Sequence, residues 1–150
     1  MNSWRGWMSS DSLTKGDRWR GRLGTAVALA SLAGARLAVA ALPFGRWRNS
    51  LGLAPNRSKP PDSLTAAQRL AAQVERAALR APFSTKCLPR AAALSWLLRR
   101  RGIAHSVVFA VRPKPLRHLP DPLHAWVEID GVKVIGDLPG PWVETLRLGG

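Results

Sequence analysis

The chain has 150 residues with one cysteine, and its 23 Lys and Arg against nine Asp and Glu give a formal net charge of +14 at pH 7. This length fits one domain or one domain with an appendage, and a single cysteine excludes an internal disulfide framework, which is typical of a protein in a reducing cytosol. The positive charge favours a polyanion, an anionic lipid or an acidic partner or peptide, without choosing among them.

The N-terminal part is basic and contains a long apolar run. Residues 1–17 are polar and rich in tryptophan, so we expect them to be loosely held and to contain no secretory signal. A helix is predicted over 17–42, with Pro43 near its end. Its apolar residues are numerous enough to raise the question of a membrane span. Arg36 lies in the middle of the run, however, so a helix packed on the domain or on a partner is favoured.

The segment GRWRNSLGLAPNRSKPPDS is rich in Pro, Gly, Ser and Asn, which is typical of a linker. We therefore divide the chain into a basic helical extension with its linker, residues 1–60, and a domain, residues 61–150. In this domain, apolar spacing predicts helices over 65–79 and 86–101. Ser84 or Thr85 could cap the second of these helices.

The remainder of the domain is predicted to be β structure. An apolar strand covers 103–111, and a loop with four prolines, RPKPLRHLPDP, follows it. Strands over 124–130 and 132–137 flank Asp130-Gly131, which is a strong signal for a two-residue hairpin. The residues after this hairpin show no clear period. The expected fold class is α+β, with helices packed on a small antiparallel sheet.

The lone cysteine, Cys87, comes at the start of the helix predicted over 86–101. The positive end of the helix dipole, with Lys86 beside it, favours a thiolate over a thiol. A cysteine with only a packing role could occupy the same position, so both interpretations stay open on this evidence alone.

The predicted hairpin places a histidine beside a carboxylate. If Asp130 and Gly131 are the two turn residues, His124 lies directly opposite Asp137 on one face of the sheet. An imidazole next to a carboxylate is held in one tautomer and can serve a thiol nucleophile as a base. An ordinary cross-strand pair is the alternative, and a one-residue slip in the turn would break the pairing.

Other polar residues are weaker candidates for this chemistry. His105 lies in an apolar strand and is expected to be structural, whereas His118 lies in the proline-rich loop and is expected to be solvated. Asp121 and Asp130 could also approach His124, but Asp121 precedes helix-breaking residues and Asp130 is used by the turn. We therefore favour Asp137 as the partner of His124.

The sequence lacks the motifs that are typical of metal-binding, phosphate-binding and nucleic-acid-binding proteins. One cysteine and three scattered histidines do not have the spacing of a zinc site, and no phosphate-binding loop is present, so no metal or cofactor is expected. Tryptophans alternate with arginines near the N-terminus, but no nucleic-acid-binding module contains them, and no nucleic-acid partner is expected.

Two blocks occur together and in order: CLPRAAALSWLLRRRGIAHSVVFAVR and HAWVEIDGVKVIGD. They resemble the lasso-peptide leader peptidases, the transglutaminase-like cysteine proteases of bacterial lasso-peptide biosynthesis, over about residues 60–138. The resemblance implies a transglutaminase-like or papain-like core in which Cys87 is the nucleophile, His124 the general base and Asp137 the third member. For the oxyanion hole, the backbone N–H of Cys87 is a candidate donor, with Gln68 and Gln73 as untested further candidates.

The same resemblance implies a reaction and its partners. A precursor peptide is cut between leader and core, and a separate ATP-dependent cyclase then closes the core onto an Asp or Glu side chain. Residues 1–60 are too short and too helical for a fused winged-helix-like recognition domain, so the chain is similar to the split form, which relies on a separate leader-recognition protein. We expect a cytoplasmic protein whose residues 17–48 contact a membrane or a partner.

Two rival functions remain at the level of the sequence. One is another acyl-transfer enzyme on the same fold, an amidase or a transglutaminase. The other is a non-enzymatic module that binds membrane or nucleic acid through its positive charge.

Overall fold

The computed structural model describes residues 15–55 and 61–149. Its helices are α1 (Lys15–Ala41), α2 (Phe44–Trp47), α3 (Ser63–Arg80) and α4 (Cys87–Arg100). Short 3-10 turns, η1 and η2, cover Arg48–Ser50 and Lys114–Leu116, and the strands are β1 (Ser106–Val111), β2 (Leu123–Ile129), β3 (Val132–Ile135) and β4 (Val143–Leu148). The strands form one antiparallel sheet in the order β3-β2-β1-β4. The predicted α+β class, with helices on a small antiparallel sheet, is confirmed.

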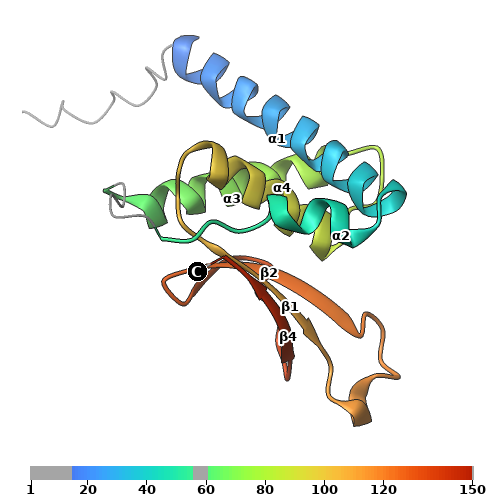
Figure 1. Ribbon diagram of the computed structural model, residues 1–150. Helices are drawn as coiled ribbons and strands as arrows, with labels where there is room; N and C mark the ends of the chain where they lie inside the picture. Colours follow the sequence, from blue (N-terminus) through green and yellow to red (C-terminus); the bar gives the residue numbers. More distant parts are fainter. Residues whose placement is uncertain (1–14, 56–60, 150) are drawn as a thin grey trace, which may run out of the picture.

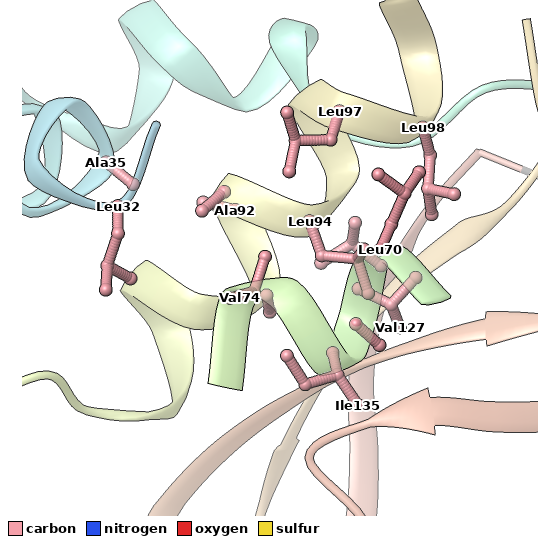
Figure 2. Packing of buried hydrophobic residues seen from close by; sticks show 14 of the residues in the cluster. Leu32, Ala35, Leu70, Val74, Ala92, Leu94, Leu97, Leu98, Val127 and Ile135 are labelled. Atoms are coloured by element: carbon pink, nitrogen blue, oxygen red, sulfur yellow. The ribbon is translucent and has the colours of Figure 1, made fainter. Parts of the chain in front are cut away.

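Helices α3 and α4 form a layer over one face of the sheet (Figure 1). Helices α3 and α4 contact strands, whereas α1 packs on α3 and α4 on the side away from the sheet. Three residues of α1, Ala28, Leu32 and Ala35, are fully buried in the same core as the leucines and alanines of α3 and α4. Figure 2 shows Leu32 and Ala35 beside this core. Alanines at these contacts let the helix axes approach closely. The boundary proposed at residue 60 stays a prediction, but α1 contributes directly to the core.

The segment predicted as a linker is folded between residues 44 and 55. It forms α2 and η1, and Leu53 then makes an isolated antiparallel bridge with His105. The buried hydroxyl of Ser95 accepts a hydrogen bond from the backbone N–H of Gly52 (2.9 Å) and lies 2.7 Å from Nε2 of His105. Nδ1 of His105 lies 2.8 Å from the carbonyl oxygen of Ile103. His105 is therefore structural, as the sequence predicts.

Strand β4 was missed at the level of the sequence. It pairs with β1 at an edge of the sheet, and its register with β1 shifts between Phe109 and Ala110. This irregularity interrupts the alternation of Val143, Leu146 and Leu148, so the segment has no regular period of two. Only the pairing with β1 identifies it as a strand.

Candidate active site

Helix α4 presents Cys87 at its first residue, with Lys86 as the N-cap. No side chain caps this end, so the predicted capping by Ser84 or Thr85 is wrong; the hydroxyl of Thr85 instead accepts a hydrogen bond from Nε of Arg90 (3.3 Å). The first backbone N–H groups of a helix have no intrahelical acceptor. The N–H of Leu88 is therefore available to the sulfur of Cys87, to which it donates a hydrogen bond.

The thiol of Cys87 is half-buried and hydrogen-bonded to the imidazole of His124. Burial acts to raise the pKa of this thiol, but the hydrogen bonds from His124, Ala125 N–H and Leu88 N–H, together with the imidazolium charge, outweigh burial and bring the pKa below its usual value. Burial acts to lower the pKa of His124, and the contact with Cys87 and the carbonyl of Gly136 raise it overall. Both shifts favour a thiolate–imidazolium pair.

The backbone of β2 reaches Cys87 because its neighbour β3 is short. Ile135, the last residue of β3, pairs with Val127, so the earlier residues of β2 have no partner in that strand. The N–H of Ala125 is thereby left to donate to the sulfur of Cys87. The reactive sulfur thus lies where a helix N-terminus meets the open edge of β2.

The ring of His124 is held from two directions. Its Nε2 lies 2.6 Å from the carbonyl oxygen of Gly136 and donates to it, which leaves Nδ1 for Cys87. The ring centroids of Trp142 and Trp126 lie 4.9 Å and 5.7 Å from that of His124. The hydrogen bond to a carbonyl, which can only accept, fixes the tautomer with an unprotonated Nδ1 in the neutral ring. Nδ1 can therefore take and return a proton at the sulfur.

The structure does not bring Asp137 to His124 within the residues it describes. The carboxylate of Asp137 is 79 % exposed and lies 3.6 Å from Nζ of Lys133. The pairs Ile129–Val132 and Glu128–Lys133, next to the turn, follow the predicted register. The register shifts between Glu128 and Val127, so that Val127 pairs with Ile135. The direct pairing of His124 with Asp137 is therefore wrong, and the third-member role of Asp137 stays a prediction without that geometric support.

Gly136 takes the position next to His124 that the sequence assigned to Asp137. Its φ is +80°, and a Cβ placed on it would lie 2.8 Å from the carbonyl oxygen of Ala125. Only glycine adopts this conformation and this close approach without strain. A glycine directly after an apolar strand was the one sequence signal for this role, and it does not distinguish an orienting carbonyl from an ordinary strand end.

The other sequence candidates lie apart from the reactive pair. Asp130 occupies the predicted hairpin turn, with Gly131 after it, and both have positive φ. Asp121 is exposed, 4.0 Å from Nζ of Lys86, and His118 is exposed on the proline-rich loop. Asp121 and His118 make no hydrogen bond or ion pair with His124 in the described part of the chain.

The two glutamines considered for an oxyanion hole lie near the wrong end of α4. Gln73 lines a cavity together with Leu97, Arg100 and Arg101. Glu75 of α3 pairs with Arg90 of α4, whereas the earlier residue Leu70 lines the cavity with the later residue Leu97, so the two helices run antiparallel side by side. Gln68, about two turns before Glu75, therefore lies beside the C-terminal half of α4, away from Cys87. The backbone N–H of Cys87 remains as a candidate donor.

Trp142 was not predicted to belong to the site. It packs against the ring of His124, and the guanidinium of Arg112 lies 4.5 Å from the centroid of its indole. No sequence signal marked this residue, because it comes after the predicted hairpin in a segment without a clear period. Among the residues that the structure describes, no group of His, Cys, Asp or Glu is arranged to hold a metal ion.

Comparison with known proteins finds one family. The sequence model of the transglutaminase-like superfamily matches residues 25–145, which include the larger, C-terminal part of α1 as well as Cys87 and His124. No curated protein and no solved structure matches the chain.

Proposed function

Because the chain belongs to the transglutaminase-like superfamily, which includes cysteine peptidases and acyltransferases, we propose that it is a cysteine peptidase. The observation that carries this proposal is the contact between Cys87 and His124, which lowers the pKa of the thiol and raises that of the imidazole. A cysteine with only a packing role has no need of a tautomer-fixed histidine and two backbone N–H donors.

The proposed reaction has two steps. The thiolate of Cys87 attacks the carbonyl carbon of the scissile peptide bond, and the imidazolium of His124 gives its proton to the leaving amine as the C–N bond breaks. Nδ1 of His124 then takes a proton from water, whose oxygen attacks the thioester. Cleavage of the C–S bond restores the thiolate–imidazolium pair and releases the product as a carboxylic acid, which loses its proton to solvent.

Backbone groups would stabilise the charge that develops on the scissile carbonyl oxygen. We assign the N–H of Cys87 to this role, since it is at the first residue of α4, where the helix dipole is positive. Asp137 is proposed to act on His124 from a distance. The charge of Lys133 lowers the pKa of His124, and the carboxylate of Asp137, 3.6 Å from Lys133, offsets that charge.

The proposed substrate is a ribosomally made lasso-peptide precursor, cut between leader and core. Support comes from the two blocks that contain Cys87 and His124, which resemble the leader peptidases of that pathway. The proposed partners are the precursor, a separate leader-recognition protein and an ATP-dependent lasso cyclase. The proposed location is the cytoplasm, which fits the single cysteine.

A processing assay tests this proposal. The chain is incubated with a precursor peptide and its leader-recognition protein, and the products are identified by mass spectrometry. Hydrolysis should yield two fragments whose masses sum to that of the precursor plus one water, and Cys87→Ala should yield none while keeping the melting temperature. Cross-linked products that have lost ammonia would favour a transglutaminase, and cleavage by Cys87→Ala would refute the assignment of the nucleophile.

A further inference from the structure

A cavity lined by arginines opens between α1, α3 and the end of α4, remote from the reactive pair. Its volume is about 850 Å³, and Arg20, Arg69, Arg100 and Arg101 line it, with no Asp or Glu among the lining residues. Within the ranges 15–55 and 61–149, none of these arginines forms an ion pair. Four unpaired guanidinium groups around one cavity attract an anionic ligand.

The same cavity has apolar walls. Leu23 and Val27 of α1 contribute on one side and Leu70 and Leu97 on the other. A ligand that satisfies both the arginines and the leucines has an anionic head and an apolar body. A phospholipid with a net negative charge has this combination.

The outer face of α1 is a second observation, independent of the cavity, that favours a lipid surface as the ligand. Between Arg22 and Arg36 the helix has no charged residue. Trp19 is 66 % exposed, Leu23 53 % and Leu37 67 %, and only 17 % of the most apolar part of the helix is buried. A helix on the surface of a soluble domain normally presents polar residues outward. Trp19, beside the exposed Arg18 and Arg20, is a residue typical of the water–lipid interface.

We propose that α1 and the arginine-lined cavity bind the surface of an anionic phospholipid membrane. Helix α1 lies along this surface and does not span it, because Ala28, Leu32 and Ala35 hold its inner face against α3 and α4. The arginines bind lipid phosphates, and Trp19, Leu23 and Leu37 enter the region just below the head groups.

This orientation leaves the reactive pair accessible. Cys87 lies at the opposite end of α4 from Arg100, a distance of about 20 Å along the helix. The sheet is on the other side of the helical layer from α1 (Figure 1). A membrane that contacts α1 therefore does not cover Cys87 or His124, and the proposal goes beyond the peptidase function and is independent of it.

Vesicle co-sedimentation tests the proposal with the full chain. We expect binding to phosphatidylcholine vesicles that contain about 30 % phosphatidylglycerol, and binding at least about tenfold weaker to phosphatidylcholine alone. Trp19→Ser/Leu23→Ser should lose most of the binding to anionic vesicles. The quadruple variant Arg20→Gln/Arg69→Gln/Arg100→Gln/Arg101→Gln should lose at least about tenfold in affinity.

A matched variant separates a built site from general charge attraction. Arg46→Gln/Arg48→Gln/Arg76→Gln/Arg80→Gln removes the same charge from exposed arginines that do not line the cavity. It should retain binding within about twofold, and Leu79→Ser, an exposed leucine of α3, is the apolar control. Equal losses in both quadruple variants would overturn the proposal. An absence of vesicle binding by the unaltered chain would also overturn it and leave the outer face of α1 to a protein partner.

Discussion

Nε2 of His124 lies 2.6 Å from the carbonyl oxygen of Gly136, so a backbone atom orients the imidazole that contacts Cys87. In the familiar triads a carboxylate or amide side chain makes this hydrogen bond. A carbonyl fixes the tautomer but brings no full negative charge. The imidazolium is therefore stabilised mainly by the thiolate that it faces.

Gly136→Ala should impair activity more than stability. The added Cβ would lie 2.8 Å from the carbonyl oxygen of Ala125 at a φ of +80°, so the backbone must shift and take the orienting carbonyl with it. We expect kcat/KM to fall on the order of 10²-fold, as for an ångström-scale misplacement. Gly45→Ala, at a site with no neighbour within 4 Å, is the control and should have wild-type activity. Wild-type activity of Gly136→Ala would show that this carbonyl does not position His124.

Asp137→Asn should have a small effect. Its carboxylate is largely exposed and pairs with Lys133, so its influence on His124 is indirect. We expect kcat/KM to fall only about two- to fivefold, since exposed ion pairs contribute little. A loss of about 10⁴-fold, as for the orienting carboxylate of a serine protease, would instead show direct contact with His124 during the reaction.

Lys133→Gln gives the complementary measurement. The positive charge of Lys133 lowers the pKa of His124, so its removal should shift that pKa upward. The alkaline limb of the pH–rate profile should then move to higher pH, whereas Asp137→Asn should move it to lower pH. Shifts in the same direction in both variants would contradict the proposed electrostatic linkage.

Cys87 should react with iodoacetamide below the usual pH range of a thiol. The pKa of Cys87 is lowered from the ordinary value of 9.0, so the thiolate persists as the pH falls through that value and is lost only at the lower pKa. His124→Ala removes a hydrogen bond and a positive charge and should raise the midpoint of the pH–rate curve. A midpoint at or above 9 in the unaltered chain would contradict the assigned pair. Cys87→Ser gives the background rate.

Trp142→Ala should lower activity by removing the aromatic contact on His124. The ring centroids are 4.9 Å apart, and such a contact contributes about 1 kcal/mol beyond the area it buries. We expect kcat/KM to fall about five- to tenfold, with Trp142→Phe restoring most of it. The rate of alkylation of Cys87, measured as a function of pH, should show a raised pKa of the Cys87 thiol in Trp142→Ala but not in Trp142→Phe. Equal losses in both variants would point instead to the hydrogen bond from the indole N–H to Leu138.

The buried pair of Ser95 and His105 should make the fold sensitive to acid. Burial lowers the pKa of His105 below 6.5, so the unfolded chain takes up a proton at a higher pH than the folded chain. The contribution of His105 to stability is therefore complete above about pH 6.5 and declines as the pH falls toward the lowered pKa. Urea unfolding as a function of pH checks this sign. The decline should be smaller in His105→Gln, and an equal decline in both proteins would contradict it.

Ser95→Ala should destabilise the chain at neutral pH. The hydroxyl accepts from Gly52 N–H and contacts Nε2 of His105, and both groups would be left without this partner in a buried place. We expect a loss of about 1–3 kcal/mol in the free energy of unfolding. Ser50 is half-buried and hydrogen-bonded to Trp47 and Trp96, so Ser50→Ala is a less buried comparison. It should lower the free energy of unfolding by less than Ser95→Ala does.

The local features of this protein follow from patterns within short segments of the sequence. An apolar run with Pro43 near its end predicted α1, and apolar spacing of 3.6 residues predicted α3 and α4, each within a few residues of its ends. Asp130-Gly131 specified the hairpin turn and the two pairs next to it. The start of α4 at Cys87 follows from helix signals within a few residues. Each of these properties depends on neighbours along the chain, which a pattern can record.

Which side chains and backbone groups contact one another depends on the packing of distant segments. One irregular residue in a strand changes every pair beyond it. Because of the register shift between Val127 and Glu128, the carbonyl of Gly136 lies next to His124, and the side chain of Asp137 contacts Lys133 instead. The packing of Trp142 on His124 and the pairing of β4 with β1 depend on contacts between segments far apart in the sequence. Such contacts are set by how the layers pack, and no periodicity within one segment reveals them.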